Sequence, residues 1–152
     1  MRQVIETVAI DTPGRGLVEI TDAVRRFVAQ QGPTTGLLTL WCRHTSASLL
    51  VQENADPDVR ADLEAFFSRL APEAPGRYMH QEEGPDDMPA HIRAALTQTQ
   101  ISIPVERGQP VWAPGRGSTC GSTGTQPICA KSCCTWSHPG RMPRSSGAAA
   151  QK

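Results

Sequence analysis

The first 111 residues alternate between apolar stretches and polar breaks in a pattern that predicts short strands. β-Branched and polar residues partly alternate over 3–10, as in a half-buried strand. The dense apolar run from Gly36 to Cys42 predicts a fully buried strand, and residues 47–52 predict its neighbour. Residues 101–105 predict a further strand, which ends in a turn at Gly108.

Three stretches between these strands have the apolar period of helices. Asp56 caps the clearest of them, and Pro57 occupies its first position, where a missing N–H costs nothing. Its apolar residues recur on one face and predict a buried stripe: Val59, Leu63, Phe66, Phe67 and Leu70. The other helices are expected to begin at polar caps: Thr21 or Asp22, and Asp86 or Asp87, the latter helix with Ile92 and Leu96 facing inward. Strands interleaved with short helices predict an α+β fold with a mostly antiparallel sheet.

The composition changes abruptly after Trp112. Residues 113–152 contain 20 Gly, Pro, Ser or Thr residues and no Leu, Val, Phe or Tyr. Such a stretch cannot bury enough apolar area to offset its chain entropy. The charge changes as well, because residues 1–106 carry nine Arg and all 15 acidic residues, a net charge of −6. Residues 107–152 carry six basic residues and no acidic ones, a net charge of +6.

Four of the five cysteines lie in this second part: Cys120, Cys129, Cys133 and Cys134. Their C-x3-C-C spacing lacks the paired C-x2-C geometry of common zinc sites. Two interpretations stay open, a disordered tail and a translation in the wrong reading frame. Cys42 lies instead within a predicted buried strand and is interpreted as a core thiol.

Several classes of protein are excluded by what the sequence lacks. No apolar run approaches the roughly 18–20 residues that a membrane-spanning helix needs. The N-terminus lacks the basic-then-apolar order of a signal peptide. The neutral total charge argues against a nucleic-acid binder, although that total combines two parts of opposite charge, and no Gly-rich phosphate loop, G-x-S-x-G elbow or H-E-x-x-H motif occurs. We therefore expect a cytoplasmic protein that binds neither membranes nor nucleic acid.

Polar side chains with catalytic potential occur where three of the predicted elements meet loops, a common place for active groups. These residues are His44, Thr45 and Ser46, then Glu53 and Asn54, then His80, Glu83, Asp87 and His91. The helix dipole near His91 disfavours an imidazolium, and a neutral imidazole can bind a metal or act as a base. Structural roles stay open: a hydrogen-bonded His44, a turn at Thr45 and Ser46, and a solvated acidic loop over 82–87.

Five sequence blocks occur together in a specific order. They are G-L-L-T-L at 36–40, H-T-S-A-S-L at 44–49, E-N-A-D-P-D-V-R at 53–60, E-G-P-D-D-M-P-A-H-I at 83–92 and I-P-V-x-x-G at 103–108. With these blocks the chain resembles the YjbQ-like family, whose members are called secondary thiamine-phosphate synthases. The resemblance covers residues 1–111 and implies a mostly antiparallel β-sandwich with short helices that assembles as a homotrimer.

The resemblance also implies an activity and a site. The activity joins a hydroxymethylpyrimidine diphosphate to a thiazole phosphate and releases pyrophosphate. Carried over position by position, the catalytic residues are His44, His80, His91, Glu53 and Asp87, and the substrate-binding residues are Thr45, Ser46, Asn54 and Glu83. A divalent metal, Mg²⁺ or Zn²⁺, is expected to neutralise the leaving diphosphate. The three histidines His44, His80 and His91 are its expected ligands.

The family continues beyond residue 111 with a segment that reads approximately L-G-T-W-Q-G-(I/V)-Y-L-x-E-H-R. The codons of W-A-P-G-R-G-S-T-C-G-S-T-G-T permit G-T-W-Q-G-V-Y-L-W-E-H-R-D in another frame, and those of Q-P-I-C-A-K-S-C-C-T-W permit A-T-H-L-R-E-V-V-L-H-L. A single-base loss near Val111 explains both the composition and the cysteines. The sequence thus predicts an incomplete domain over 1–111 that lacks its last strands, followed by a disordered, frame-shifted tail over 112–152.

Other functions stay open beside the synthase-like transferase. Three histidines and several carboxylates also suit a metal-dependent hydrolase of a small phosphorylated substrate. A trimeric ligand-binding module would use the same pocket without catalysis. A frame-shifted product would be unstable or inactive, because loss of two strands would uncover apolar side chains: Leu38, Leu40, Ile101 and Ile103.

Overall fold

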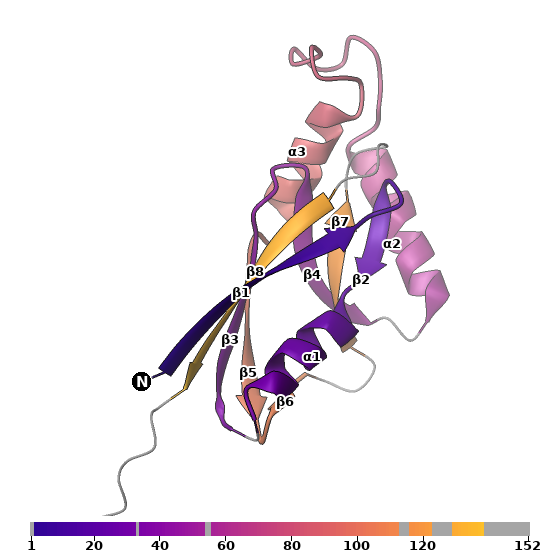
Figure 1. The fold of residues 1–152 in the computed structure, drawn as a ribbon. Helices are drawn as coiled ribbons and strands as arrows, with labels where there is room; N and C mark the ends of the chain where they lie inside the picture. Colours follow the sequence, from indigo (N-terminus) through magenta and orange to yellow (C-terminus); the bar gives the residue numbers. More distant parts are fainter. Residues whose placement is uncertain (1, 33, 54–55, 113–115, 123–128, 139–152) are drawn as a thin grey trace, which may run out of the picture.

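Two antiparallel sheets and three helices make up the fold (Figure 1). The computed structural model describes residues 2–32, 34–53, 56–112, 116–122 and 129–138. One sheet has the order β1-β8-β3-β5-β6 and the other the order β2-β7-β4. The strands are β1 (Arg2–Asp11), β2 (Gly16–Glu19), β3 (Gly36–Cys42), β4 (Ala47–Glu53), β5 (Gln100–Glu106), β6 (Gln109–Pro110), β7 (Arg116–Ser122) and β8 (Cys129–His138). The helices are α1 (Thr21–Gln30), α2 (Pro57–Leu70) and α3 (Asp87–Leu96), so the predicted α+β class is confirmed.

The core lies between α1 and strands of both sheets. Val24, Phe27 and Val28 on one face of α1 are buried, and they belong to one cluster with Leu38 and Leu40 of β3. The helix begins after Ile20 rather than after Thr21 or Asp22, so the predicted cap is wrong. Burial of its apolar face holds this short helix in place, as is usual for helices of this length.

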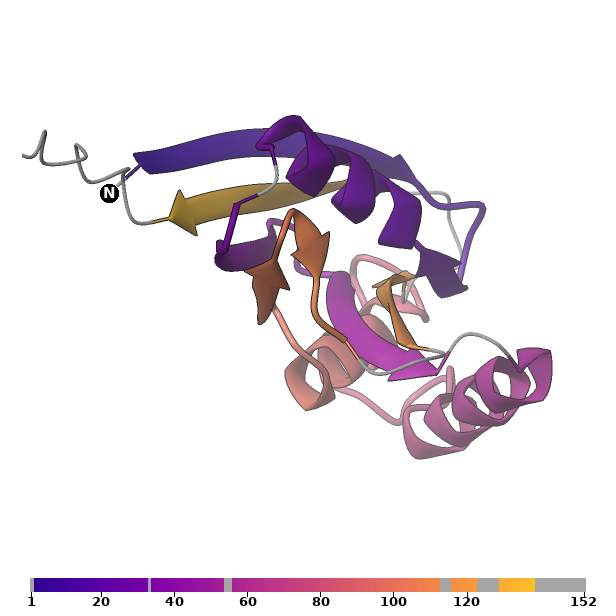
Figure 2. The same cartoon turned by 90° about the horizontal axis from the view of Figure 1, so that it is seen from below.

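Two strands, β7 and β8, lie beyond residue 111, where the sequence predicts that the last strands are lacking. The backbone of β8 pairs with β1 on one side and β3 on the other, and β7 lies between β2 and β4 (Figure 2). The hydrogen bonds of a sheet join main-chain N–H and C=O groups, and every residue except proline carries both. The residues of β7 and β8 can therefore pair with the strands on either side although their sequence is poor in apolar residues. Leu38 and Leu40, which were expected to be uncovered, are 0 % exposed. The remaining residues of the predicted tail, 113–115, 123–128 and 139–152, lie outside the described residues.

Helices α2 and α3 lie on the opposite side of the sheets from α1 (Figures 1 and 2). Asp56 caps α2 as predicted, since its Oδ1 accepts the backbone N–H of Asp58 at 2.8 Å. The predicted buried stripe of α2 is wrong, because Phe66 and Leu70 are 50 % and 45 % exposed. This helix lies at the periphery and packs against the short strand β2.

The inner face of α3 also differs from the prediction. Leu96 is exposed, whereas the buried residues of this helix are Pro89, Ala90 and Arg93. The buried face of α3 is therefore centred on Ala90 and Arg93 and not on the predicted Ile92 and Leu96. No helix in the described part of the chain has the length and apolar character needed to cross a membrane.

Candidate metal centre

His80, Asp87 and His91 bring their side chains together at the start of α3. The Nε2 atoms of His80 and His91 lie 3.0 and 3.2 Å from the same atom, Oδ2 of Asp87. One ligand atom from each residue lies within 4.8 Å of the other two. The Asp87 side chain is only 13 % exposed, whereas the imidazoles are 43 % and 39 % exposed. The carboxylate is therefore shielded, and solvent can reach both imidazoles.

The two segments that carry these residues explain why they meet. Asp87 and His91 are four residues apart on α3 and so share one helix face. His80 comes from residues 71–86, which connect α2 to α3 and form the loop at the top of Figure 1. The loop brings His80 back over the first turn of α3, where its ring centroid lies 6.1 Å from that of His91.

Local contacts shape this loop. The Tyr78 hydroxyl donates to the carbonyl oxygen of Pro72 at 3.1 Å, which closes the first half of the loop. Gly84, in the E-G-P-D-D block, has a φ of +118°, and a Cβ there would lie 3.1 Å from Oδ1 of Asp86. Glycine is thus required where the chain turns into α3. A pocket of about 170 Å³ borders the cluster, lined by Ala74, Pro75, Tyr78, His80, Gln81 and Pro85.

The donor set fits a divalent metal. Two imidazole nitrogens and one carboxylate oxygen, with a fourth position left open, are typical of catalytic zinc sites. Ligand atoms that are about 2.0–2.1 Å from a tetrahedral zinc ion lie about 3.3 Å from one another. The observed Nε2–Oδ2 distances of 3.0 and 3.2 Å are close to that spacing. His80, Asp87 and His91 could therefore hold Zn²⁺ or a similar first-row ion.

His44 does not join this group, which differs from the predicted three-histidine metal set. The backbone N–H of Ser46 donates to Nδ1 of His44 at 3.0 Å. Nδ1 therefore presents its lone pair to Ser46, and the proton of the neutral ring is on Nε2. In this state His44 can donate a hydrogen bond from Nε2 but has no free lone pair there for a metal.

His44 instead lines a second pocket, of about 320 Å³, at the end of β3. Residues 41–45 form one wall and Ala94 of α3 contributes to the other. Ala94 is three residues beyond His91, so one helix borders both this pocket and the candidate metal centre. The exposed Arg43 and Thr45 supply a positive charge and a hydroxyl at the pocket.

The other predicted site residues fall in different places. Thr45 and Ser46 lie beside His44 in the turn between β3 and β4. Glu83 is exposed in the loop before α3 and is not one of the three clustered ligands. Glu53 ends β4, and its side chain lies outside the described part of the structure, as does Asn54.

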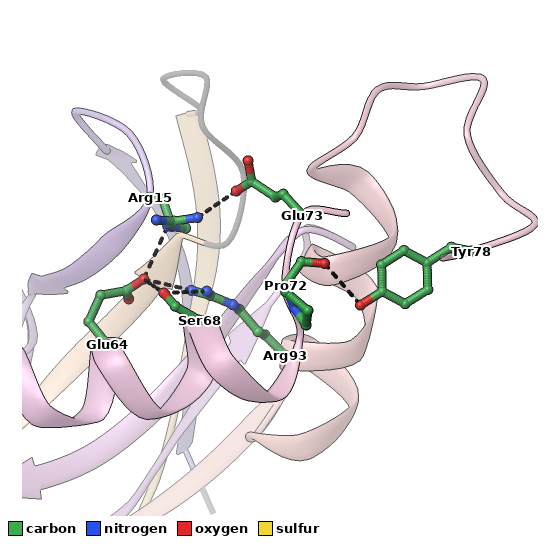
Figure 3. Close-up of polar contacts among 7 residues, drawn as sticks. All are labelled: Arg15, Glu64, Ser68, Pro72, Glu73, Tyr78 and Arg93. Carbon is green, nitrogen blue, oxygen red and sulfur yellow. Dashed lines mark hydrogen bonds and ion pairs between the residues drawn. The ribbon is translucent and has the colours of Figure 1, made fainter. Parts of the chain in front are cut away.

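A network of ion pairs behind the metal centre was missed by the sequence reasoning (Figure 3). Arg93 of α3 is 4 % exposed, and its guanidinium contacts Oε1 of Glu64 at 2.9 Å and Oγ of Ser68 at 3.2 Å. Oε1 of Glu64 also lies 3.1 Å from Nε of Arg15, which in turn pairs with Glu73. No signal in the sequence indicated it, because Ile92 and Leu96 predicted a different inner face for α3.

Cys42 is a buried thiol, as predicted. Burial raises the pKa of this thiol, and a backbone hydrogen bond of His44 lowers the pKa and only partly offsets the effect. A thiol with a raised pKa is a poor nucleophile at neutral pH. Cys42 is thus a core thiol that also borders the pocket of His44, and its raised pKa argues against a role as a nucleophile.

The family model described as "UPF0047 protein YjbQ-like" matches residues 6–115. The chain belongs to this family. A UPF0047 protein of Synechocystis is 51 % identical over 108 residues, which are 71 % of this chain and 74 % of that protein. The UPF0047 protein YjbQ of Escherichia coli O157:H7 is 41 % identical over 105 residues, 68 % and 75 % of the two chains.

Solved structures extend the likeness beyond the matched sequence. A conserved hypothetical protein from Thermus thermophilus has a TM-score of 0.75 at 29 % identity, over 84 % of this chain and 95 % of that one. A protein of unknown function from Sulfolobus solfataricus has a TM-score of 0.77 at 16 % identity, over 90 % and 100 % of the two chains, and it shares the fold. This YjbQ-family chain therefore shares its fold with these structures over most of their length, while the family model ends at residue 115.

Proposed function

We propose that the protein is a metal-dependent enzyme for small phosphorylated substrates, with an activity similar to that of a secondary thiamine-phosphate synthase. The proposed reaction joins a hydroxymethylpyrimidine diphosphate to a thiazole phosphate and releases pyrophosphate. The observation that carries the proposal is the convergence of His80, Asp87 and His91 on one point. A divalent metal bound there would supply positive charge to stabilise the departing pyrophosphate.

The chain's own residues support the binding of such substrates. Arg43 and Thr45 line the pocket that shares α3 with the metal centre, and they offer a charge and a hydroxyl to a phosphate group. His44 lines the same pocket and would donate from Nε2 to a phosphate oxygen, because Ser46 occupies its Nδ1. In this proposal, residues at the end of β3 bind the phosphate groups of the substrate. A metal ion at the start of α3 would neutralise the charge of the departing pyrophosphate.

A metal-binding experiment tests the carrying observation. The full chain is titrated with Co²⁺, whose visible absorption reports tetrahedral binding, and then with Zn²⁺ in competition. We expect one bound metal ion in the wild type and none at the same concentration in Asp87→Ala or His91→Ala. Asp22→Ala, which removes an exposed carboxylate of α1, is the matched control and should bind as the wild type does. Equal binding by all four proteins would refute the metal centre.

The second candidate function is a metal-dependent hydrolase, which the same donor set favours because two histidines and a carboxylate leave a position for a water molecule. Incubation with the pyrimidine diphosphate alone separates the two. A transferase releases pyrophosphate only when the thiazole phosphate is also present, whereas a hydrolase releases phosphate or pyrophosphate without it. Substrate binding without turnover by both wild type and His44→Ala would instead indicate a ligand-binding module. We further propose a cytoplasmic homotrimer, as the family resemblance implies, which sedimentation equilibrium would test.

We also infer that the sequence beyond about residue 111 comes from a shifted reading frame. The strand register supports this inference. Positions 132, 134 and 136 of β8 lie opposite Cys42, Leu40 and Leu38, and opposite residues share a face of the sheet. The codons permit valine, leucine and leucine at these three positions in the alternative frame, once one base is restored near Val111. It likewise has valine and leucine at positions 118 and 120 of β7, opposite Val51 and Leu49.

A further inference from the structure

The three candidate metal ligands come from two segments that must keep a fixed relation to one another. Asp87 and His91 belong to α3, whereas His80 belongs to the loop over 71–86. Loops of this length have many conformations of similar energy. His80 is also partly exposed, so the packing of its own side chain cannot alone hold it 3.0 Å from Asp87. Contacts elsewhere in the fold can help to fix α3 and the loop relative to one another.

Helix α3 is held from its far side by Arg93. Two residues along a helix correspond to a rotation of about 200°, so Arg93 points away from the face that carries His91. Its guanidinium contacts Glu64 and Ser68, which are one turn apart on α2 (Figure 3). In the described residues Nε of Arg93 has no hydrogen-bond partner, and Glu64 is its ion-pair partner at 2.9 Å. The buried charge therefore depends on Glu64 for its compensation.

The same carboxylate is linked to the loop that carries His80. Oε1 of Glu64 lies 3.1 Å from Nε of Arg15, in the turn between β1 and β2. The other end of the Arg15 guanidinium pairs with Glu73, the third residue of the loop. These contacts form a series of alternating positive and negative side chains that leads from α3 to the loop: Arg93, Glu64, Arg15 and Glu73. Glu64 is the shared member, because one of its oxygens meets both arginines.

We propose that Glu64 and Arg93 are positioning residues for the metal centre. Their ion pair sets the rotation of α3 about its axis, and the link through Arg15 sets the base of the loop, so that His80 meets Asp87 and His91 at ligand distance. This inference rests on the proposed function, since it presupposes that these three side chains bind a metal. Residues that orient metal ligands typically change metal affinity about 10–100-fold when they are replaced.

The test compares metal affinity with stability in the full chain. Glu64→Gln keeps the shape and one acceptor oxygen but removes the charge, and Arg93→Lys keeps the charge but loses the fork that spans Glu64 and Ser68. Asp22→Asn is the matched control, because it removes the exposed partner of Arg25 on α1. Co²⁺ affinity is measured by titration, and the urea midpoint is measured without metal. We expect a loss of at least about tenfold in affinity for Glu64→Gln, a smaller loss for Arg93→Lys and none for Asp22→Asn.

Each result of these measurements either supports or overturns the positioning role of Glu64 and Arg93. A lower urea midpoint with unchanged Co²⁺ affinity of the folded protein would mean that the network only stabilises the fold, and would overturn the proposal. Loss of affinity in Glu64→Gln, while its circular dichroism stays that of the wild type, would support it. If Glu64→Gln does not fold, Ser68→Ala and Arg15→Met each remove one arm and take its place, with the same expectation of weakened binding. Failure of the wild type itself to bind Co²⁺ would refute the metal centre, which is distinguishable from failure of the positioning role.

Discussion

Restoring one base in the codon of Val111 should stabilise the protein strongly. In the alternative frame that the codons permit, the change places valine or leucine at four positions that now hold serine or cysteine: Ser118, Cys120, Ser132 and Cys134. By register these positions lie opposite Val51, Leu49, Cys42 and Leu40, of which the last three are buried. The restored chain would therefore present apolar side chains to the core from both β7 and β8.

The size of the effect follows from the burial of these partners. Full burial of a valine or leucine is worth about 1.5–3 kcal/mol, and exchanging a serine or cysteine for one of them recovers about 1–2 kcal/mol. Four such exchanges add about 4–8 kcal/mol, compared with a total stability of about 5–15 kcal/mol for an ordinary domain. At a urea dependence of about 2 kcal/mol per molar, the unfolding midpoint should rise by about 2–4 M.

Urea unfolding of both chains, followed by far-ultraviolet circular dichroism, measures this difference. We expect the chain as written to unfold at low urea concentration or without a cooperative transition, and the restored chain to unfold cooperatively. Equal midpoints would refute the reasoning about the core face of β7 and β8. A cooperative thermal transition of the chain as written in a trimeric state would contradict its expected instability. Sequencing of the gene around Val111 decides the frame itself, since a frame that never encodes G-T-W-Q excludes the single-base loss.

Three further predictions concern residues whose surroundings do not involve the metal centre. Leu40→Ala removes a fully buried side chain of β3 and should cost about 2–5 kcal/mol in the free energy of unfolding, measured in urea on the restored chain; a loss below about 1 kcal/mol would show that the site is not tightly packed. Asp56→Ala removes the cap of α2 and should cost about 0.5–2 kcal/mol, whereas Asp58→Ala, which does not cap, should cost less. Because burial raises the pKa of Cys42, the stability from its neutral thiol is complete below the thiol's unfolded pKa and is lost as pH rises through the folded one. Unfolding midpoints between pH 7 and pH 10 should therefore fall more steeply in the wild type than in Cys42→Ala, and parallel curves would contradict this.

Sequence patterns predicted an element well where its position depends on residues that are close together in the sequence. Asp56 and Pro57 open α2 as expected, because a cap and a first-turn proline act within a few residues. His80 and His91 were expected to share a site. In the structure both lie beside Asp87, His80 in the loop between α2 and α3 and His91 in α3 itself. The buried strand from Gly36 to Cys42 was also expected from its continuous apolar run.

Most of the differences between the predictions and the structure involve contacts between segments that are distant in the sequence. The apolar stripe of α2 was expected to be buried, but the period of a stripe does not say whether another element covers it. The spacing of His44 from the other histidines did not reveal that Ser46 occupies its Nδ1. Arg93 was not considered, because a basic residue in a helix is ordinarily solvated, and only the fold shows Glu64 beside it.

The place of β8 in its sheet has a consequence for how the chain is made. Strand β1 is at the edge and is hydrogen-bonded to the sheet through β8, so the first strand to leave the ribosome must wait for the last described one before it gains its sheet partner. Until then its main-chain donors and acceptors are available to other chains. A change that weakens the pairing of β8 would therefore act on the opening segment of the polypeptide, and aggregation would begin at the part of the chain farthest along the sequence from that change.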